Sequence, residues 1–123
     1  MSEEKKVSTT SLTEVLIGID GKPLEMRMDE NNSEEMTVRK AVLMCLLQGP
    51  DLLAQMNKAP MADGEKLKCF MLACDIGDKD RTGYTFSPEE VVLIKTLAVI
   101  RLPTEPYGML LLKLDPSLVK DKD

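Results

Sequence analysis

The stretch "SPEEVVLIKTLAVIRLP", residues 87–103, decides the fold class, because it holds the beginning, body and end of one helix. Ser87 is followed by Pro88 and, three residues after the serine, by Glu90, which is the pattern of a capping box with proline at the first helical position. Polar residues are few beyond the first turn, and Pro103 ends the segment. A helix that is apolar on nearly every side lies at the centre of a core or packs against a neighbouring subunit.

A second helix is expected in "MTVRKAVLMCLLQ", residues 36–48. Ser33 can cap it, because two glutamates then fall in the first turn and suit the positive end of the helix dipole. Thr37 is an alternative cap one turn later. The pair Gly49-Pro50 is a common stop signal, so the helix is expected to end there.

Similar signals predict the remaining helices. Asp63 is expected to cap one that Gly77 ends, and Thr104 to cap the last one, which lies before the polar tail. A short helix or irregular turn is expected between Pro50 and Pro60. The three segments concerned are 51–59, 64–76 and 104–115.

The N-terminal part has β character. In "EVLIGIDGKPLEMRM" the Asp20-Gly21 pair favours a tight turn, because glycine accepts the positive φ that such a turn needs. Apolar and charged residues alternate after the turn, which predicts a β-hairpin over 15–28. The fold class is therefore mainly α with a small N-terminal β-hairpin, in a single compact domain of four to five helices. This domain is expected to span 13–116, between a polar arm at 1–12 and a polar tail at 117–123.

Composition narrows the classes of function. The chain of 123 residues has a net charge of −5 and no cluster of Lys and Arg, so we expect neither direct nucleic-acid binding nor attachment to a membrane. It contains no histidine, which removes the commonest general base, and it has no serine-nucleophile motif, so we expect no enzyme. The first residues lack a hydrophobic signal core, and Cys45, Cys69 and Cys74 lie in apolar helical runs without a C-x-x-C motif. We therefore expect reduced, buried thiols in a cytoplasmic protein.

The loop "DKDRTGYTFSPE", residues 78–89, raises the possibility of a calcium site. It places oxygen ligands at the spacing of an EF-hand loop, with a glycine at the sixth position for the sharp bend. Side chains and one main-chain carbonyl would supply the ligands, from Asp78, Asp80, Thr82, Tyr84 and Glu89.

A turn followed by a capped helix explains the same residues without a bound metal ion. Ser87, Glu89 and Glu90 suit the first turn of a helix, and the residues before them read as a polar turn. Gly77 stops the preceding helix early, the eighth loop position is Thr85 rather than an aliphatic residue, and no second EF-hand is visible. The capped-helix interpretation is favoured, and calcium is kept as the alternative.

Apolar residues in the last two helices exceed what a thin domain of this length easily covers. We expect the excess to serve self-association or docking on another protein. The residues predicted to make these contacts are Val92, Leu93, Leu97 and Met109.

The order of motifs resembles a class of small α-helical accessory proteins encoded by tailed phages and prophages. The resemblance covers roughly residues 15–114 and rests on five segments: "IDGKPLE", "MTVRKAVLMCLL", "DGEKLKCFMLACDI", "FSPEEVVLIKTLA" and "YGMLLLKLD". It implies a non-enzymatic protein of the bacterial host cytoplasm that acts through protein–protein contacts. Such a protein would be a virion-assembly chaperone or adaptor, or a binder of a host factor. The expected partners are a second copy of the chain and an unidentified protein.

Overall fold

The computed structural model describes residues 9–27, 29–57 and 62–115. Within them the chain forms four helices and two small antiparallel sheets, which pair β1 with β4 and β2 with β3. This confirms a mainly α fold with β structure near the N-terminus, in a single compact domain. The elements are β1 (Thr10–Ser11), β2 (Glu25–Arg27), β3 (Ser33–Glu35), α1 (Val38–Asn57), α2 (Asp63–Ile76), β4 (Gly83–Tyr84), α3 (Pro88–Arg101) and α4 (Thr104–Leu114).

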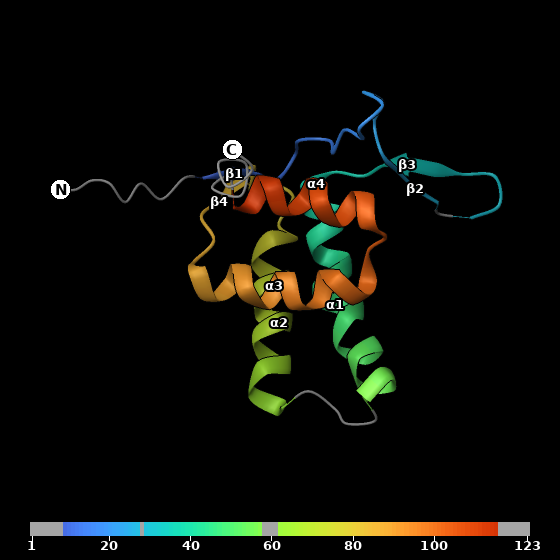
Figure 1. Ribbon diagram of the computed structural model, residues 1–123. Coiled ribbons are helices and arrows are strands. Elements are labelled where there is room, and N and C mark those ends of the chain that lie inside the picture. Colours follow the sequence, from blue (N-terminus) through green and yellow to red (C-terminus); the bar gives the residue numbers. More distant parts are fainter. Residues whose placement is uncertain (1–8, 28, 58–61, 116–123) are drawn as a thin grey trace, which may run out of the picture.

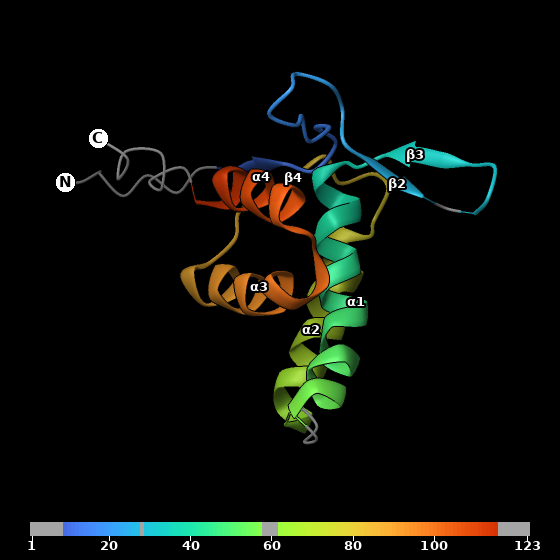
Figure 2. The ribbon, with the colours of Figure 1, turned by 45° about the vertical axis from the view of Figure 1, so that its right-hand side comes forward.

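The helices form two crossed pairs (Figure 1). The first pair, α1 and α2, runs side by side in opposite directions, while α3 and α4 cross α1. Figure 2 shows the same arrangement after a rotation, and in both views the connected ends of α1 and α2 extend beyond α3. Helix α1 contacts all three other helices, so it is the central element of the fold.

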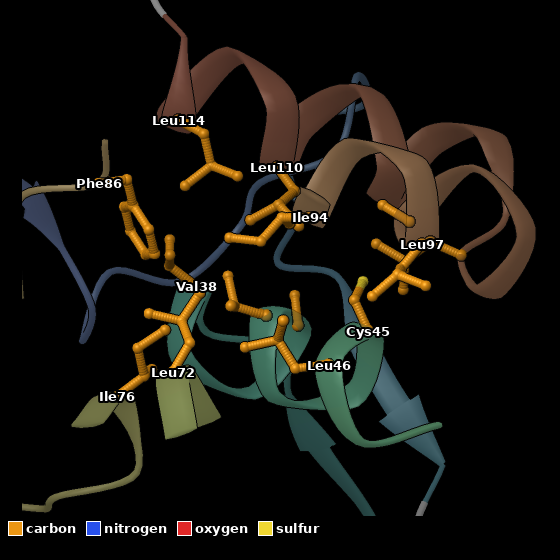
Figure 3. Packing of buried hydrophobic residues seen from close by; sticks show 14 of the residues in the cluster. Val38, Cys45, Leu46, Leu72, Ile76, Phe86, Ile94, Leu97, Leu110 and Leu114 are labelled. Atoms are coloured by element: carbon orange, nitrogen blue, oxygen red, sulfur yellow. The ribbon is translucent and has the colours of Figure 1, made fainter. Parts of the chain in front are cut away.

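The core lies where the helices meet, and Figure 3 shows its side chains pointing toward one another. Leucine, isoleucine and valine fill most of it, as the scarcity of aromatic residues leads one to expect. Each such side chain stabilises the fold by about 1.5–3 kcal/mol when it leaves water. The fully buried members include Val38, Leu46, Ile76, Ile94, Leu97 and Leu110.

Helix α1 does not stop at Gly49-Pro50 as predicted, but continues to Asn57 and absorbs most of the expected 51–59 segment. Both residues are buried, and Gly49 lies at the crossing with α3. A β-carbon on Gly49 would lie 2.8 Å from the β-carbon of Leu97, so the glycine is there to let two helices approach closely. Pro50 removes one helical hydrogen bond, and the burial of this crossing offsets that loss.

The predicted helix starts are confirmed in part. Thr37 Oγ1 accepts the N–H of Lys40 at 3.2 Å, so Thr37 caps α1, and the alternative cap Ser33 lies in β3 instead. The capping box of α3 is present, and Gly77 ends α2 as predicted. The other two expected caps, Asp63 and Thr104, are each the first residue of their helix. The cap positions belong to the residues before them, which make no side-chain cap bond.

The predicted hairpin is confirmed at its turn and corrected beyond it. Gly21 has a φ of 83°, and Ile17 forms an antiparallel bridge with Pro23 across the turn, but β2 then pairs with β3 across the next loop. The reason is a three-way junction of backbone hydrogen bonds, each 2.8 Å long. The N–H of Leu16 donates to the carbonyl of Met36, the N–H of Met36 donates to the carbonyl of Leu24, and the N–H of Leu24 donates to the carbonyl of Leu16. A third segment thus satisfies backbone groups that a simple hairpin would leave open, while Leu16 and Met36 enter the core.

The predicted N-terminal arm is wrong for residues 9–12. Thr10–Ser11 forms β1, and Leu12 is fully buried, with its N–H donating to the carbonyl of Thr82 at 2.9 Å. Residues 1–8 and the predicted tail at 117–123 lie outside the described residues. No helix in the described part of the chain is both long enough and apolar enough to cross a membrane.

Candidate functional site

The loop with calcium-like spacing is organised around Arg39, which reaches it from α1. The Arg39 Nε donates to the carbonyl of Ile76 at 2.9 Å, and its Nη2 donates to the carbonyls of Asp78, at 3.2 Å, and of Arg81. These carbonyls belong to the end of α2 and the first half of the loop. The guanidinium therefore ties two main-chain carbonyls of the loop to the end of α2.

The side chains predicted to bind calcium do not gather into a shell. Asp78 Oδ1 accepts the N–H of Asp80 at 3.0 Å, which makes a local turn. Tyr84 belongs to β4, and Glu89 lies exposed in the first turn of α3. The main-chain carbonyl of Thr82 accepts a hydrogen bond from the N–H of Leu12. Across residues 9–27, 29–57 and 62–115, no group of three or more Asp, Glu, Cys or His side chains is placed to hold a metal ion.

The second half of the loop is fixed by Glu90. One oxygen of its carboxylate accepts the N–H of Ser87 at 2.9 Å, and the other accepts the hydroxyl of Tyr84 at 3.1 Å. Burial and the nearby Glu90 carboxylate raise the pKa of Tyr84. Its ring lies 4.7 Å from that of Phe86, and the Arg81 guanidinium sits 5.5 Å from the ring centre. These contacts tie the loop to α3 and give it a structural role.

The four predicted contact residues occupy different environments. Val92 is 62% exposed on α3, whereas Leu93 and Met109 are partly buried against the core. Leu97 is 0% exposed, so its predicted place on a contact surface is corrected. Leu97 lies at the crossing with Gly49, so α1 covers this one of the predicted contact residues.

A shallow groove of about 640 Å³ runs beside α4. Its wall is mostly apolar, and its rim carries one positive and one negative side chain. Part of its lining is Ile19, Lys95, Glu105, Tyr107, Met109 and Leu112.

The turn before β2 closes one side of this groove. Glu105 Oε2 accepts the N–H of Ile19 at 2.7 Å, which fixes the turn against the start of α4. A β-carbon on Gly18 would lie 2.6 Å from the same oxygen, so a larger residue there would have to displace the Glu105 carboxylate. Ile19 is left 85% exposed. The predicted contact residue Met109 thus belongs to a groove whose other wall comes from a turn about 90 residues earlier in the chain.

Helix α2 carries a second apolar face that the sequence reading missed. Leu67, Phe70 and Met71 are 58%, 57% and 58% exposed, although they are large and apolar. Together with the exposed Cys74 they follow the 3–4 spacing of a single helical face, which we call the α2 stripe. The opposite face supplies the core with Cys69, Leu72, Ala73 and Ile76. The signal in the sequence is two apolar stripes on one helix, of which a small domain buries only one.

The cysteines divide into two groups. Cys45 and Cys69 are buried, and burial raises the pKa of both thiols, that of Cys45 to about 12. Cys74 is exposed, so the expectation of a buried thiol is wrong for this residue. A raised pKa lowers the thiolate fraction and with it the reactivity of the two buried cysteines.

Comparison of the chain with protein-family models, with curated proteins and with solved structures gave no match.

Proposed function

We propose that this chain is a non-enzymatic accessory protein that acts through protein–protein contacts and assembles as a homo-oligomer. On the basis of the motif resemblance, we further propose that it is a phage-type protein of the bacterial host cytoplasm. Its role would be in virion assembly or in binding a host factor. The missing histidine and the missing nucleophile motifs favour a binding role over catalysis.

The observation that carries the proposal is the number of large apolar side chains left in water. Single exposed hydrophobic residues are normal on protein surfaces, but groups of them on one element mark contact sites. Here they group on α2, on α3 and beside the α4 groove. The exposed side chains in question are Ile17, Ile19, Leu67, Phe70, Met71, Val92, Val99 and Leu112.

The α4 groove is the site we assign to the protein partner. Val92 and Val99 are seven residues apart and share one face of α3, and Lys95 lies between them and lines the groove. Lys95 thus links the exposed face of α3, which carries Val92, to the groove that Met109 lines, and this supports a contact that includes both residues. An apolar trough with a charged rim suits an apolar segment of another protein better than a small polar substrate.

Native mass spectrometry of the purified chain tests the proposal, with and without calcium at about micromolar concentration. We expect a multimer of the 13.7 kDa chain whose mass does not change when calcium is added. A calcium-insensitive monomer would contradict the homo-oligomer. One calcium ion per chain, lost in Asp78→Ala, would replace the proposal with a calcium-binding module.

A further inference from the structure

Leu67, Phe70 and Met71 of the α2 stripe are each more than half exposed in the described part of the chain, and the buried residues of α2 lie on its opposite face. In Figures 1 and 2 the N-terminal half of α2, which includes Leu67, extends past α3 beside α1. Lys66 on the flank of the helix reaches Asp51 of α1 at 3.6 Å, so this flank is tied to the chain itself. The three large side chains of the stripe lie next to this flank and keep more than half of their surface in solvent.

We infer that the α2 stripe binds the same stripe of a second copy, with the two helices antiparallel about a twofold axis between Phe70 and Met71. The inference rests on the proposed function and assigns its self-contact to one surface. In this arrangement Phe70 of one copy packs against Met71 of the other, and Leu67 packs against Cys74. A twofold contact of this kind needs a patch that is complementary to itself.

Charge supports a second copy as the occupant. Lys68 and Asp75 are both exposed and lie seven residues apart, so they flank the stripe on the same side. Neither forms an ion pair with another residue in the described part of the chain. In the antiparallel pair, Lys68 of one copy and Asp75 of the other lie two residues apart along the helix axis, about 3 Å. The twofold axis repeats this pairing, so each dimer holds two opposite-charge contacts.

The size of the stripe sets the strength of the contact. Three large side chains that are each more than half exposed leave on the order of 350 Å² of apolar surface in water. Two copies together then remove about 700 Å² of such surface, which lies below the roughly 1,200 Å² buried in stable complexes. We therefore expect a dimer that dissociates on dilution through the micromolar range.

Charge reversal in the full-length chain tests the arrangement by sedimentation equilibrium. Lys68→Asp and Asp75→Lys each place like charges opposite one another, and each is expected to raise the dissociation constant about tenfold. The double variant restores opposite charges with the signs exchanged, so its dissociation constant should return to within about threefold of the original. Lys68 and Asp75 are both exposed, and unchanged circular dichroism of each variant would confirm that it folds.

Cysteine cross-linking provides a second readout. In the antiparallel pair the two copies of position 71 lie one residue apart along the axis, so Met71→Cys in a Cys74→Ser background should form a disulfide-linked dimer under mild oxidation. The two copies of Cys74 lie seven residues apart, about 10 Å, which is too far for a disulfide. The unmodified chain should therefore stay unlinked and serves as the control.

The possible results separate this inference from the proposed function. Restoration by the double charge reversal together with the position-71 disulfide supports antiparallel α2 pairing. A multimer whose dissociation constant does not change in any of these variants, and which forms no disulfide at position 71, overturns the α2 pairing. The proposed homo-oligomer is not contradicted by that result. A monomer at every concentration overturns both.

Discussion

Gly49 and Leu97 are in such close contact that a β-carbon on the glycine would lie 2.8 Å from the β-carbon of the leucine. This contact fixes the crossing of α1 and α3, around which the rest of the core is packed. The nominal helix-stop pair Gly49-Pro50 is therefore part of the helix crossing, and α1 passes through it.

Gly49→Ala should destabilise the protein by about 1–2 kcal/mol. The added methyl group has to displace Leu97 or separate the helices, and overpacking of this kind typically costs about 1–3 kcal/mol. The higher helix propensity of alanine recovers up to about 1 kcal/mol of that loss. Chemical denaturation of the two proteins measures the difference.

Gly108→Ala is the matched control, because a β-carbon on this glycine of α4 meets no atom within 4 Å. The same substitution should here stabilise the protein by about 0.5–1 kcal/mol through helix propensity alone. If both variants shift the free energy of unfolding in the same direction, the close α1–α3 crossing is not what constrains Gly49.

Arg39→Met should destabilise the protein by roughly 1–3 kcal/mol, because the carbonyls of Ile76, Asp78 and Arg81 lose a charged donor. The stability of Arg39→Lys should lie between those of the original protein and Arg39→Met, because an ammonium group cannot reproduce the planar fork of a guanidinium. The melting temperatures of the three proteins give the order. Equal stability of the lysine variant and the original would show that charge alone holds the loop.

Calcium should leave the melting temperature unchanged, because Arg39 already binds the main-chain carbonyls of Asp78 and Arg81, and no group of three or more acidic side chains in the described part of the chain is placed to hold a metal ion. A ligand that binds only the folded state raises stability with its concentration. Thermal scans at increasing calcium are the measurement, with Asp78→Ala as the comparison. A rise in melting temperature that the variant lacks would establish the site.

Thiol labelling of the native protein should show one fast cysteine and two protected ones. Cys74 is exposed, whereas Cys45 and Cys69 are buried and have raised pKa values. The Cys74→Ser variant should lose the fast phase completely, and unfolding should release the other two thiols. A fast phase that persists in this variant would mean that α2 opens readily.

Alkaline pH should weaken the fold through the same thiols. Burial raises the pKa of Cys45 from its ordinary 9.0 to about 12, so the unfolded chain loses this proton at lower pH than the folded chain. The stability of the neutral buried thiol is therefore complete below pH 9 and is lost progressively as pH rises toward 12. Denaturation at increasing pH checks the direction, and Cys45→Ala should flatten the slope.

The sequence predicts those features of the fold that depend on neighbouring residues. The capping box at Ser87, the cap at Thr37 and the end of α2 at Gly77 all follow from short-range hydrogen bonding. The continuation of α1 through Gly49 depends on Leu97, which lies 48 positions later, and the β2–β3 pairing depends on the junction of Leu16 with a distant segment. Contacts of this range leave no local trace in the sequence.

The candidate surfaces were harder to predict for the same reason. Apolar spacing shows that a helix has an apolar face, but it does not show which face the neighbouring helices cover. Leu97 was predicted to lie on a contact surface and is buried, because it lies at the crossing of α3 with α1. The exposed face of α2, which carries Phe70, was not predicted.

The most direct test of the account is the sedimentation of the original chain against Phe70→Glu, over a concentration range through the micromolar region. The account predicts a mass that rises from 13.7 kDa to twice that value for the original chain, and a constant monomer mass for Phe70→Glu. Lys79→Glu, a charge change at an exposed loop position, should behave like the original. A monomer mass for the original chain at every concentration would contradict the central claim that it assembles through its exposed apolar surface.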